Sequence, residues 1–210
     1  MASELKINIF VEGIDDKKFI SDFISYHFNV SVEKNIFHLE GKDKINTKIE
    51  LFNSSSASII QQKTATNKKN ILVFDADGEY NNGGFKKRLF ELNEIKVKYG
   101  INFDTFLFPN NKEDGELEDL LERIFTDDVQ PILNCFKNYT DCITKIDPKY
   151  SKPNKKGKIF AVAESIVGAD NAKGSARDYL NSELWNLEDD AVKPLKDFLS
   201  TYFESKPTTT

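Results

Sequence analysis

Short apolar runs alternate with longer amphipathic segments over the first 125 residues. Four runs are rich in strand-forming residues, and each leads into a segment whose apolar residues recur at helical spacing. The expected strands are 6–11, 36–39, 71–74 and 103–108. The expected helices cover about 15–28, 44–65, 85–99 and 116–125, with a break at the serine run 54–58. This alternation predicts an α/β fold with a mostly parallel central sheet, flanking helices and right-handed crossovers.

Beyond residue 125 the pattern becomes helical. Helices are expected at 129–143, 159–166, 175–185 and 191–203, and a basic, proline-containing loop at 145–158 separates the first two. The simplest interpretation of that loop is a solvated surface linker. The chain therefore divides into an α/β domain (1–125), an α-helical C-terminal region packed on it (126–204) and a disordered tail (205–210).

Composition and charge are typical of a globular protein and do not indicate a membrane protein or a strongly basic nucleic-acid-binding protein. The 210 residues are 39% hydrophobic and 30% charged, as in ordinary globular proteins, and the net charge is −5. Binding to nucleic acid would therefore require a local basic patch or a metal. No apolar run approaches the ~18 residues of a membrane span, and the first residues do not resemble a secretory signal. We expect a cytoplasmic protein, in which Cys135 and Cys142 are reduced, mostly buried thiols on one helix.

The most hydrophobic run ends in two aspartates. Ile71–Phe74 leads directly into Asp75 and Asp77, and Gly78 follows. Such a run indicates a strand buried on both faces, and open α/β sheets bind their ligands at the carboxyl ends of these strands. Two carboxylates at this spacing repel each other unless a cation lies between them, and their oxygens suit Mg²⁺. The alternative is a polar turn with no ligand.

Acidic residues also follow two other expected strands. Glu12 comes at the end of the first strand, and Asp16 lies four residues later, where it also suits the N-cap or first turn of a helix. The segment Glu113–Asp119 follows the strand at 103–108, although its carboxylates also suit the first turn of a helix. Because the carboxyl ends of parallel strands lie at the same edge of a sheet, we expect these acidic groups to converge there.

Taken in order, these motifs resemble a toprim domain, the catalytic fold of topoisomerases, bacterial primases and related nucleases. The toprim pattern is a glutamate at the end of the first strand and Asp-x-Asp after a later strand, and it is matched by Phe10–Gly13 and Val73–Gly78. Pro109 and Gly115–Leu121 further resemble the toprim domains of overcoming-lysogenization-defect nucleases and of stand-alone bacterial toprim proteins of unassigned function. The resemblance covers about residues 5–125 and implies a toprim-like fold there.

The resemblance also implies a role for each matching residue. Glu12 would be a general acid/base or a metal ligand. One or two Mg²⁺ or Mn²⁺ ions would be held by acidic residues from the three motifs, namely Glu12, Asp16, Asp75, Asp77 and Glu116 or Glu118. Two metal ions about 3.5–4 Å apart can neutralise charge on the attacking and leaving oxygens of a phosphodiester. Such nucleases also use a lysine; the candidates are Lys155, Lys156 and Lys158, and we take Lys158 as the catalytic one.

The expected function is metal-dependent phosphodiester chemistry on nucleic acid, with DNA favoured over RNA. The sequence has no Gly-x-x-x-x-Gly-Lys-Ser/Thr loop, no recognisable topoisomerase-type tyrosine domain and no zinc ribbon, so the protein would act alone or with a separate ATPase or other protein partner. One alternative is a non-catalytic module that binds a metal or a nucleotide. Another is a haloacid-dehalogenase-like phosphatase, because Phe74–Gly78 resembles its nucleophile motif. That motif normally lies near the N-terminus with Thr or Val after the glycine, whereas Glu79 follows here.

Overall fold

The structure, a computed structural model, describes residues 5–39, 68–147 and 149–203. Within these residues, the central sheet has four strands in the order β2-β1-β3-β4, and every pairing is parallel. The strands are β1 (Ile7–Val11), β2 (Ile36–His38), β3 (Lys69–Asp75) and β4 (Asp104–Phe108). The predicted α/β class with a parallel sheet is confirmed.

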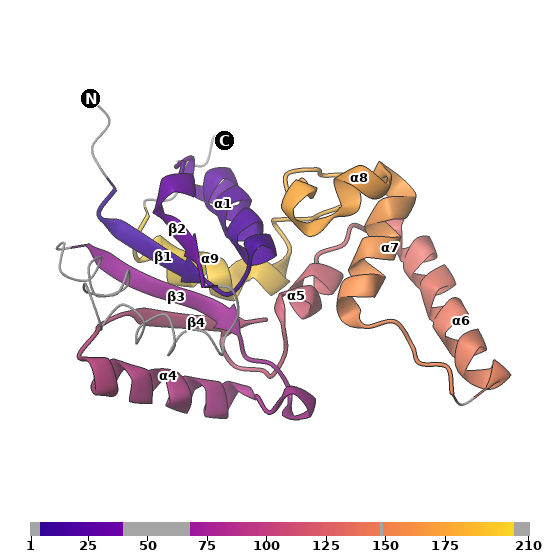
Figure 1. The fold of residues 1–210 in the computed structure, drawn as a ribbon. Coiled ribbons are helices and arrows are strands. Elements are labelled where there is room, and N and C mark those ends of the chain that lie inside the picture. The colour runs from indigo at the N-terminus through magenta and orange to yellow at the C-terminus, as the bar shows by residue number, and fades with distance from the viewer. Residues whose placement is uncertain (1–4, 40–67, 148, 204–210) are drawn as a thin grey trace.

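Helices flank both faces of the sheet and continue beyond its edge (Figure 1). Helix α4 covers one face, α1 and α9 lie on the other, and α5 to α8 lie beyond the carboxyl ends of the strands. The helices are α1 (Ile14–Phe28), α4 (Phe85–Tyr99), α5 (Leu117–Arg123), α6 (Gln130–Ile146), α7 (Lys155–Val167), α8 (Ala169–Ala172) and α9 (Lys193–Ser200). Short 3-10 turns are η1 (Glu33–Asn35), η2 (Glu79–Asn81), η3 (Asp127–Val129), η4 (Gly174–Ala176) and η5 (Asp190–Val192).

Both faces of the sheet are buried, which explains why its strands are continuously apolar rather than alternating. Alternate residues such as Val11 and Val73 pack against the cluster that includes α1 and α5. Phe10 and Phe74 pack on the opposite side, against α4. Each fully buried side chain of this kind contributes roughly 1.5–3 kcal/mol, so the strand ends that carry the acidic residues are firmly positioned.

The C-terminal region shares the larger of these two clusters. Tyr179, Trp185 and Leu199 are buried together with residues of β1 and α1. The Trp185 ring stacks on Phe125 with 4.7 Å between ring centroids, and the two residues also form an antiparallel backbone bridge. Tyr179 and Trp185 are therefore core residues.

The helix predicted over 175–185 is absent from the described structure, where the segment forms η4 and further turns. Its hydrogen bonds form isolated turns, such as the Trp185 N–H donating to the Asn181 carbonyl over 2.9 Å, and contacts with α1 and α8, rather than the continuous pattern of a helix. The Tyr179 N–H donates to Asp22 Oδ2 over 3.2 Å, and the Arg177 guanidinium donates to the Ala172 carbonyl. The helix predicted over 44–65 and the tail over 205–210 lie outside the described residues.

Helix α7 begins earlier than the sequence pattern predicted, and this places three lysines on its first turn. Its N-cap is Asn154, whose Oδ1 accepts a hydrogen bond from the Gly157 N–H over 2.8 Å. Residues 155–158, expected in a loop, are therefore helical. Helix α6 likewise runs to Ile146, beyond its predicted end.

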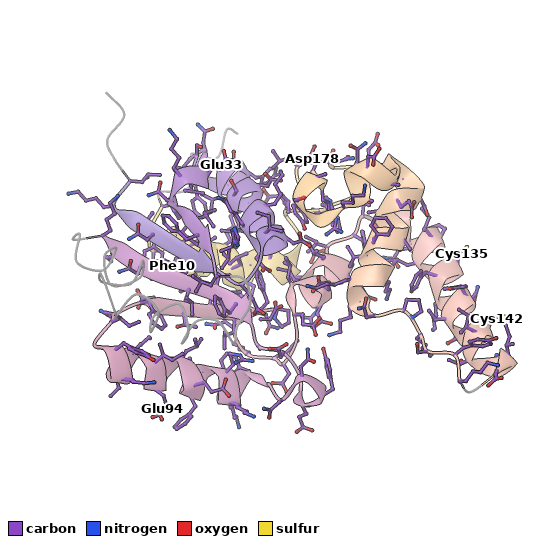
Figure 2. The ribbon with its side chains drawn as sticks, viewed as in Figure 1. Phe10, Glu33, Glu94, Cys135, Cys142 and Asp178 are labelled. Atoms are coloured by element: carbon purple, nitrogen blue, oxygen red, sulfur yellow. The ribbon has the colours of Figure 1, made fainter. Side chains whose placement is uncertain are left out.

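The two cysteines are exposed rather than buried, which corrects the expectation for them. Cys135 and Cys142 are free thiols on α6, at the side of the molecule farthest from the sheet (Figure 2). Helix α6 packs against α7 and η3, and Thr140 is its one buried residue. Among the described helices, none combines the length and apolar character needed to cross a membrane.

Candidate functional site

The carboxyl ends of β1 and β3 lie side by side and carry the two best-matched acidic residues. Val11 pairs with Val73 in parallel register, Glu12 follows Val11 directly, and Asp75 is the last residue of β3. Both acidic side chains line a pocket of about 640 Å³. The pocket is further lined by Asp77, Tyr80, Asn81, Glu116, Pro153, Asn154, Lys155 and Lys156. The predicted convergence of β1, β3 and the segment before α5 at one edge is thus observed.

Asp75 lies at the centre of the acidic residues. Its Oδ1 accepts a hydrogen bond from the Leu117 N–H over 2.8 Å, which ties the end of β3 to the start of α5. Burial, together with the negative charges of Asp16, Glu12 and Glu118, raises the pKa of Asp75 well above its ordinary value. A cation beside this carboxyl group would offset that repulsion.

Asp16 caps α1 and also lies among the acidic residues of the site. Its Oδ2 accepts a hydrogen bond from the Gly13 N–H over 2.7 Å at the beginning of α1, as expected of a capping residue. Burial nevertheless raises the pKa of Asp16 from 3.8 to about 7, and the charges of Glu12 and Glu118 act in the same direction. The Gly13 hydrogen bond and Lys156 only partly oppose this increase. Asp16 is therefore electrostatically part of the acidic site.

Glu118 is buried, whereas a simple first-turn carboxylate would be solvated. It is 7% exposed, and its Oε1 lies 3.9 Å from Lys156 Nζ. Its Oε2 is buried without a hydrogen-bond partner among the described residues. Burial raises the pKa of Glu118, although Lys156 acts against this. A buried carboxylate oxygen without a partner is costly, and a bound cation would satisfy it.

Among the described residues, the Asp77 carboxylate, unlike that of Asp75, forms an ion pair with an arginine. Its Oδ2 accepts from Arg88 Nη2 over 2.8 Å, and its Oδ1 accepts from Asn81 Nδ2 over 3.1 Å. Its backbone exchanges two hydrogen bonds with Gly115, of 2.7 and 2.9 Å. A Cβ at position 115 would lie 2.5 Å from the Asp119 carboxylate, and φ there is 146°, so this close approach requires glycine. Asp77 thus fixes the pocket wall through an ion pair.

Glu116 lies at the rim of the pocket. Its Oε1 accepts a hydrogen bond from the Tyr80 hydroxyl group, and its backbone N–H donates to Asp119 Oδ2 over 2.7 Å. Lys155 Nζ also donates to Asp119 Oδ2, over 2.7 Å. These contacts connect η2, α5 and α7 around the mouth of the pocket. Of the two candidate glutamates on this segment, Glu118 therefore belongs to the buried group and Glu116 to the rim.

The lysines at the pocket are Lys155 and Lys156, whereas Lys158 pairs with Glu122 one turn farther along α5 and does not line the pocket. Burial would lower the pKa of Lys156, but the charges of Glu118, Asp75 and Asp16 outweigh it and raise the value. Lys156 therefore stays positively charged beside the carboxylates. The structure thus puts Lys156, rather than our choice Lys158, near the acidic site.

Among the described residues, no three His, Cys, Asp or Glu side chains are already arranged to hold a metal ion. The donor chemistry nevertheless suits a hard cation, since every acidic group at the pocket offers carboxylate oxygens. Sequence reasoning missed Arg88 and Tyr80. The burial of Arg88 could not be predicted, because an arginine in an amphipathic helix is ordinarily exposed. Tyr80 could have been predicted to lie at the site, because it comes just after the Asp-Ala-Asp-Gly motif.

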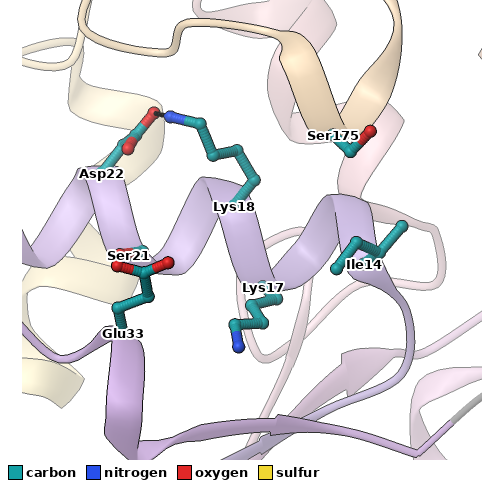
Figure 3. Close-up of a pocket in the computed structure, with 7 residues that line it drawn as sticks. All are labelled: Ile14, Lys17, Lys18, Ser21, Asp22, Glu33 and Ser175. Carbon is teal, nitrogen blue, oxygen red and sulfur yellow. Dashed lines mark hydrogen bonds and ion pairs between the residues drawn. The ribbon is translucent and has the colours of Figure 1, made fainter.

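A second pocket, of about 290 Å³, lies on the outer side of α1 (Figure 3). Its charged groups are mixed in sign, and Lys18 forms an ion pair with Asp22 one turn away. Asp22 also accepts from the Tyr179 N–H, so its carboxylate serves to hold the C-terminal region on α1. This pocket has a structural explanation, and the acidic pocket remains the candidate site.

The fold and pocket define an α/β protein with an acidic site at the edge of a parallel sheet. The sequence profile of a family described as "Protein of unknown function (DUF3226)" matches residues 6–204. The match covers nearly the whole chain, so the chain belongs to this family. No curated protein and no solved structure matches the chain. Because the family description names no activity, function has to be argued from the pocket.

Proposed function

We propose that the protein is a toprim-type enzyme that cleaves phosphodiester bonds in nucleic acid with the help of Mg²⁺ or Mn²⁺. The observation that carries this proposal is the crowding of Asp75 by Glu12, Asp16 and Glu118, which raises its pKa. Folding like charges together is unfavourable, and structures retain such clusters where a functional cation or proton compensates them. The resemblance of the strand-end motifs to toprim domains supports the same conclusion.

The residues that would hold the cation come from β1, β3, α1 and α5. Glu12, Asp75 and Glu118 are the principal candidates, with Asp16 assisting, and they would serve one ion or two. The unpartnered Oε2 of Glu118 is the observation in favour of a cation here. Asp77, held by Arg88, supports the wall instead. When bound, the ion would neutralise charge on the reacting phosphodiester.

Cationic groups on the other side of the pocket suit the phosphate of a substrate. Lys155 and Lys156 lie on the first turn of α7, and both line the pocket together with Glu12 and Asp75. The first turn of a helix favours anions because its N–H groups and dipole are oriented toward them. In a protein of net charge −5, these lysines provide the local positive charge that binding to a polyanion requires.

Glu12 is the residue that we assign to proton transfer. It is only partly buried, it lines the pocket, and its charge influences both Asp75 and Asp16. A carboxylate in this position can accept a proton from an attacking hydroxyl group or water molecule. Lys156 would stabilise the negative charge that develops on the phosphate. DNA is proposed ahead of RNA on the toprim resemblance alone.

Any use of ATP would depend on a separate protein partner, because this sequence has no nucleotide-triphosphate loop of its own. We further propose that the enzyme works in the cytoplasm. The free thiols of Cys135 and Cys142 fit a reducing compartment.

The test combines cleavage with metal binding. Purified protein should nick supercoiled plasmid DNA in Mn²⁺ or Mg²⁺, and Asp75→Asn and Glu118→Gln should each abolish nicking. Glu122→Gln is the matched control, since Glu122 lies one turn from Glu118 on α5 and pairs with Lys158. Its activity should equal that of the wild type. Nicking that survives in both Asp75→Asn and Glu118→Gln would refute the assignment of this site.

Thermal unfolding gives a readout that is independent of activity. Mn²⁺ at 100 times its dissociation constant should stabilise the wild type by about 2.7 kcal/mol, and Glu118→Gln should lose most of that gain. Stabilisation by Mn²⁺ without cleavage would identify a binding module. Formation of a covalent aspartyl-phosphate analogue on Asp75 with beryllofluoride would instead favour the phosphatase alternative.

A further inference from the structure

Tyr80 is a large aromatic side chain at the mouth of the acidic pocket, and it is 68% exposed. It lies on η2, within the segment 78–84, whose other residues are glycine, glutamate or asparagine. Single exposed hydrophobic side chains are common on protein surfaces, but Tyr80 is the one aromatic side chain among the described residues that line the acidic pocket. Burial in the core does not explain its position.

Polar contacts hold the Tyr80 ring in place. Its hydroxyl group donates to Glu116 Oε1, and Lys155 Nζ lies 3.4 Å from the hydroxyl oxygen. The edge of the ring lies close to Gly78, where an added Cβ would be 2.5 Å from Tyr80 Cε1. These contacts restrict the Tyr80 ring before any ligand binds. Binding a ligand against the ring would therefore cost less side-chain entropy.

The face of the ring remains open. Lys155 Nζ is 3.4 Å from the hydroxyl oxygen but 5.7 Å from the ring centroid, so the ammonium group lies beside the hydroxyl end rather than over the ring. An exposed, fixed aromatic face with a lysine at its edge combines the two features that proteins use for single-stranded nucleic acid. These are a stacking surface for a base and a cation for the adjoining phosphate.

We infer that Tyr80 stacks an unpaired base of a single-stranded nucleic acid whose phosphate lies at Lys155 and Lys156. This inference rests on the proposed function, because it places the neighbouring phosphodiester at the acidic pocket. A base that is stacked in a duplex has no free face for the tyrosine ring. The site therefore selects single-stranded or locally unpaired segments over intact duplex, and Tyr80 determines that preference.

The test measures binding separately from cleavage. A fluorescent all-thymidine DNA oligonucleotide and a duplex of equal length are titrated with protein in Ca²⁺ and in EDTA, and fluorescence anisotropy is recorded. Tyr80→Leu should weaken binding to the single strand roughly 10-fold, within the range for loss of one stacked base. Tyr80→Phe keeps the ring and loses only the hydroxyl bond to Glu116, so its affinity should stay within about 2-fold of wild type.

Phe90→Leu is the matched control, since Phe90 is 64% exposed on α4 and does not line the pocket. It should bind like the wild type. Equal affinity of wild type and Tyr80→Leu, an equal loss in Tyr80→Phe and Tyr80→Leu, or tighter binding to duplex would each overturn the inference. Plasmid nicking is scored separately in Mg²⁺. A failure there counts against the proposed reaction, whereas a Tyr80-dependent preference for the single strand would still support the stacking role.

Discussion

Arg88 Nη2 donates to Asp77 Oδ2 over 2.8 Å, and both side chains are buried. The two aspartates of the Asp75-Ala76-Asp77 motif therefore have different surroundings. Asp77 is neutralised by an arginine from α4, whereas Asp75 is surrounded by other carboxylates. Although Asp75 and Asp77 are only two residues apart, Asp77 lies beside a positive charge and Asp75 beside negative charges.

Substitution of the two aspartates should change stability in opposite directions. Asp77→Ala removes the buried partner of Arg88 and leaves it only the partly exposed Glu91. The free energy of unfolding should therefore fall by somewhat less than the roughly 3–5 kcal/mol expected when a buried charge loses its partner completely. Asp75→Asn removes a repelled carboxyl group and should preserve or raise that free energy at pH 8, without added metal. Urea denaturation measures both. The double variant Asp77→Leu/Arg88→Met should recover much of the loss, and no recovery would contradict the ion-pair explanation.

Asp16 should make the protein less stable as the pH rises from about 4 to 7. Because folding raises its pKa from 3.8 to about 7, the folded state binds the proton more tightly over this interval. The unfolding free energy therefore decreases as the pH increases, by an amount on the order of 1–4 kcal/mol. Asp16→Asn keeps an acceptor for the Gly13 N–H and should reduce this decrease, while the raised pKa values of Asp75 and Glu118 account for what remains.

Urea denaturation at several pH values without metal tests this dependence. Asp170→Asn provides the comparison, since the Asp170 side chain is 95% exposed and its loss should leave the pH dependence unchanged. A wild-type stability that rises between pH 4 and 7 and is unaffected by Asp16→Asn would contradict the prediction.

Two lysines on the same turn of α7 should contribute unequally to catalysis. Lys156 lines the pocket and its Nζ lies 3.9 Å from Glu118 Oε1, whereas Lys158 pairs with Glu122. Lys156→Met should reduce the rate of plasmid nicking roughly 100-fold, as expected for loss of a charge that stabilises the transition state. Lys158→Met should change it less than about 2-fold. A larger loss for Lys158→Met would restore Lys158 as the catalytic lysine.

Both cysteines on α6 should react readily with thiol reagents in the folded protein. Both Cys135 and Cys142 are free and exposed, so Ellman's reagent should titrate two thiols per chain in the native protein. Adding denaturant should speed the reaction only slightly. A native protein in which neither thiol reacts until it is unfolded would show that α6 is covered in solution.

Much of the sheet could be predicted from the sequence because burial on both faces leaves a strong pattern. Helix α4 was located at its observed bounds, since its apolar residues repeat at helical spacing and Gly100 adopts the left-handed conformation at its end (φ 61°). A helix was predicted over 175–185 because apolar residues recur there at helical spacing, at positions 176, 179, 180 and 184. Tyr179 and Trp185 are buried by contacts with distant elements, which no local pattern reveals.

The strand-end acidic residues of the pocket were found from sequence, but the division of roles among them was not. Glu12 and Asp75 follow apolar strands, and parallel strands necessarily bring their ends to one edge. The pairing of Asp77 with Arg88 depends on how α4 packs across the sheet, which the sequence does not specify. The start of α7 was missed although Asn154, a favoured capping residue, precedes Lys155.

The order of the pocket residues along the chain has a consequence for folding. Asp75 and the three carboxylates that raise its pKa, Glu12, Asp16 and Glu118, all precede α7 in the chain, whereas Lys155 and Lys156 lie on the first turn of α7. A chain that ends before α7 would bring these carboxylates together without Lys155 and Lys156. We therefore expect the α/β part alone to fold less stably than it does within the full chain.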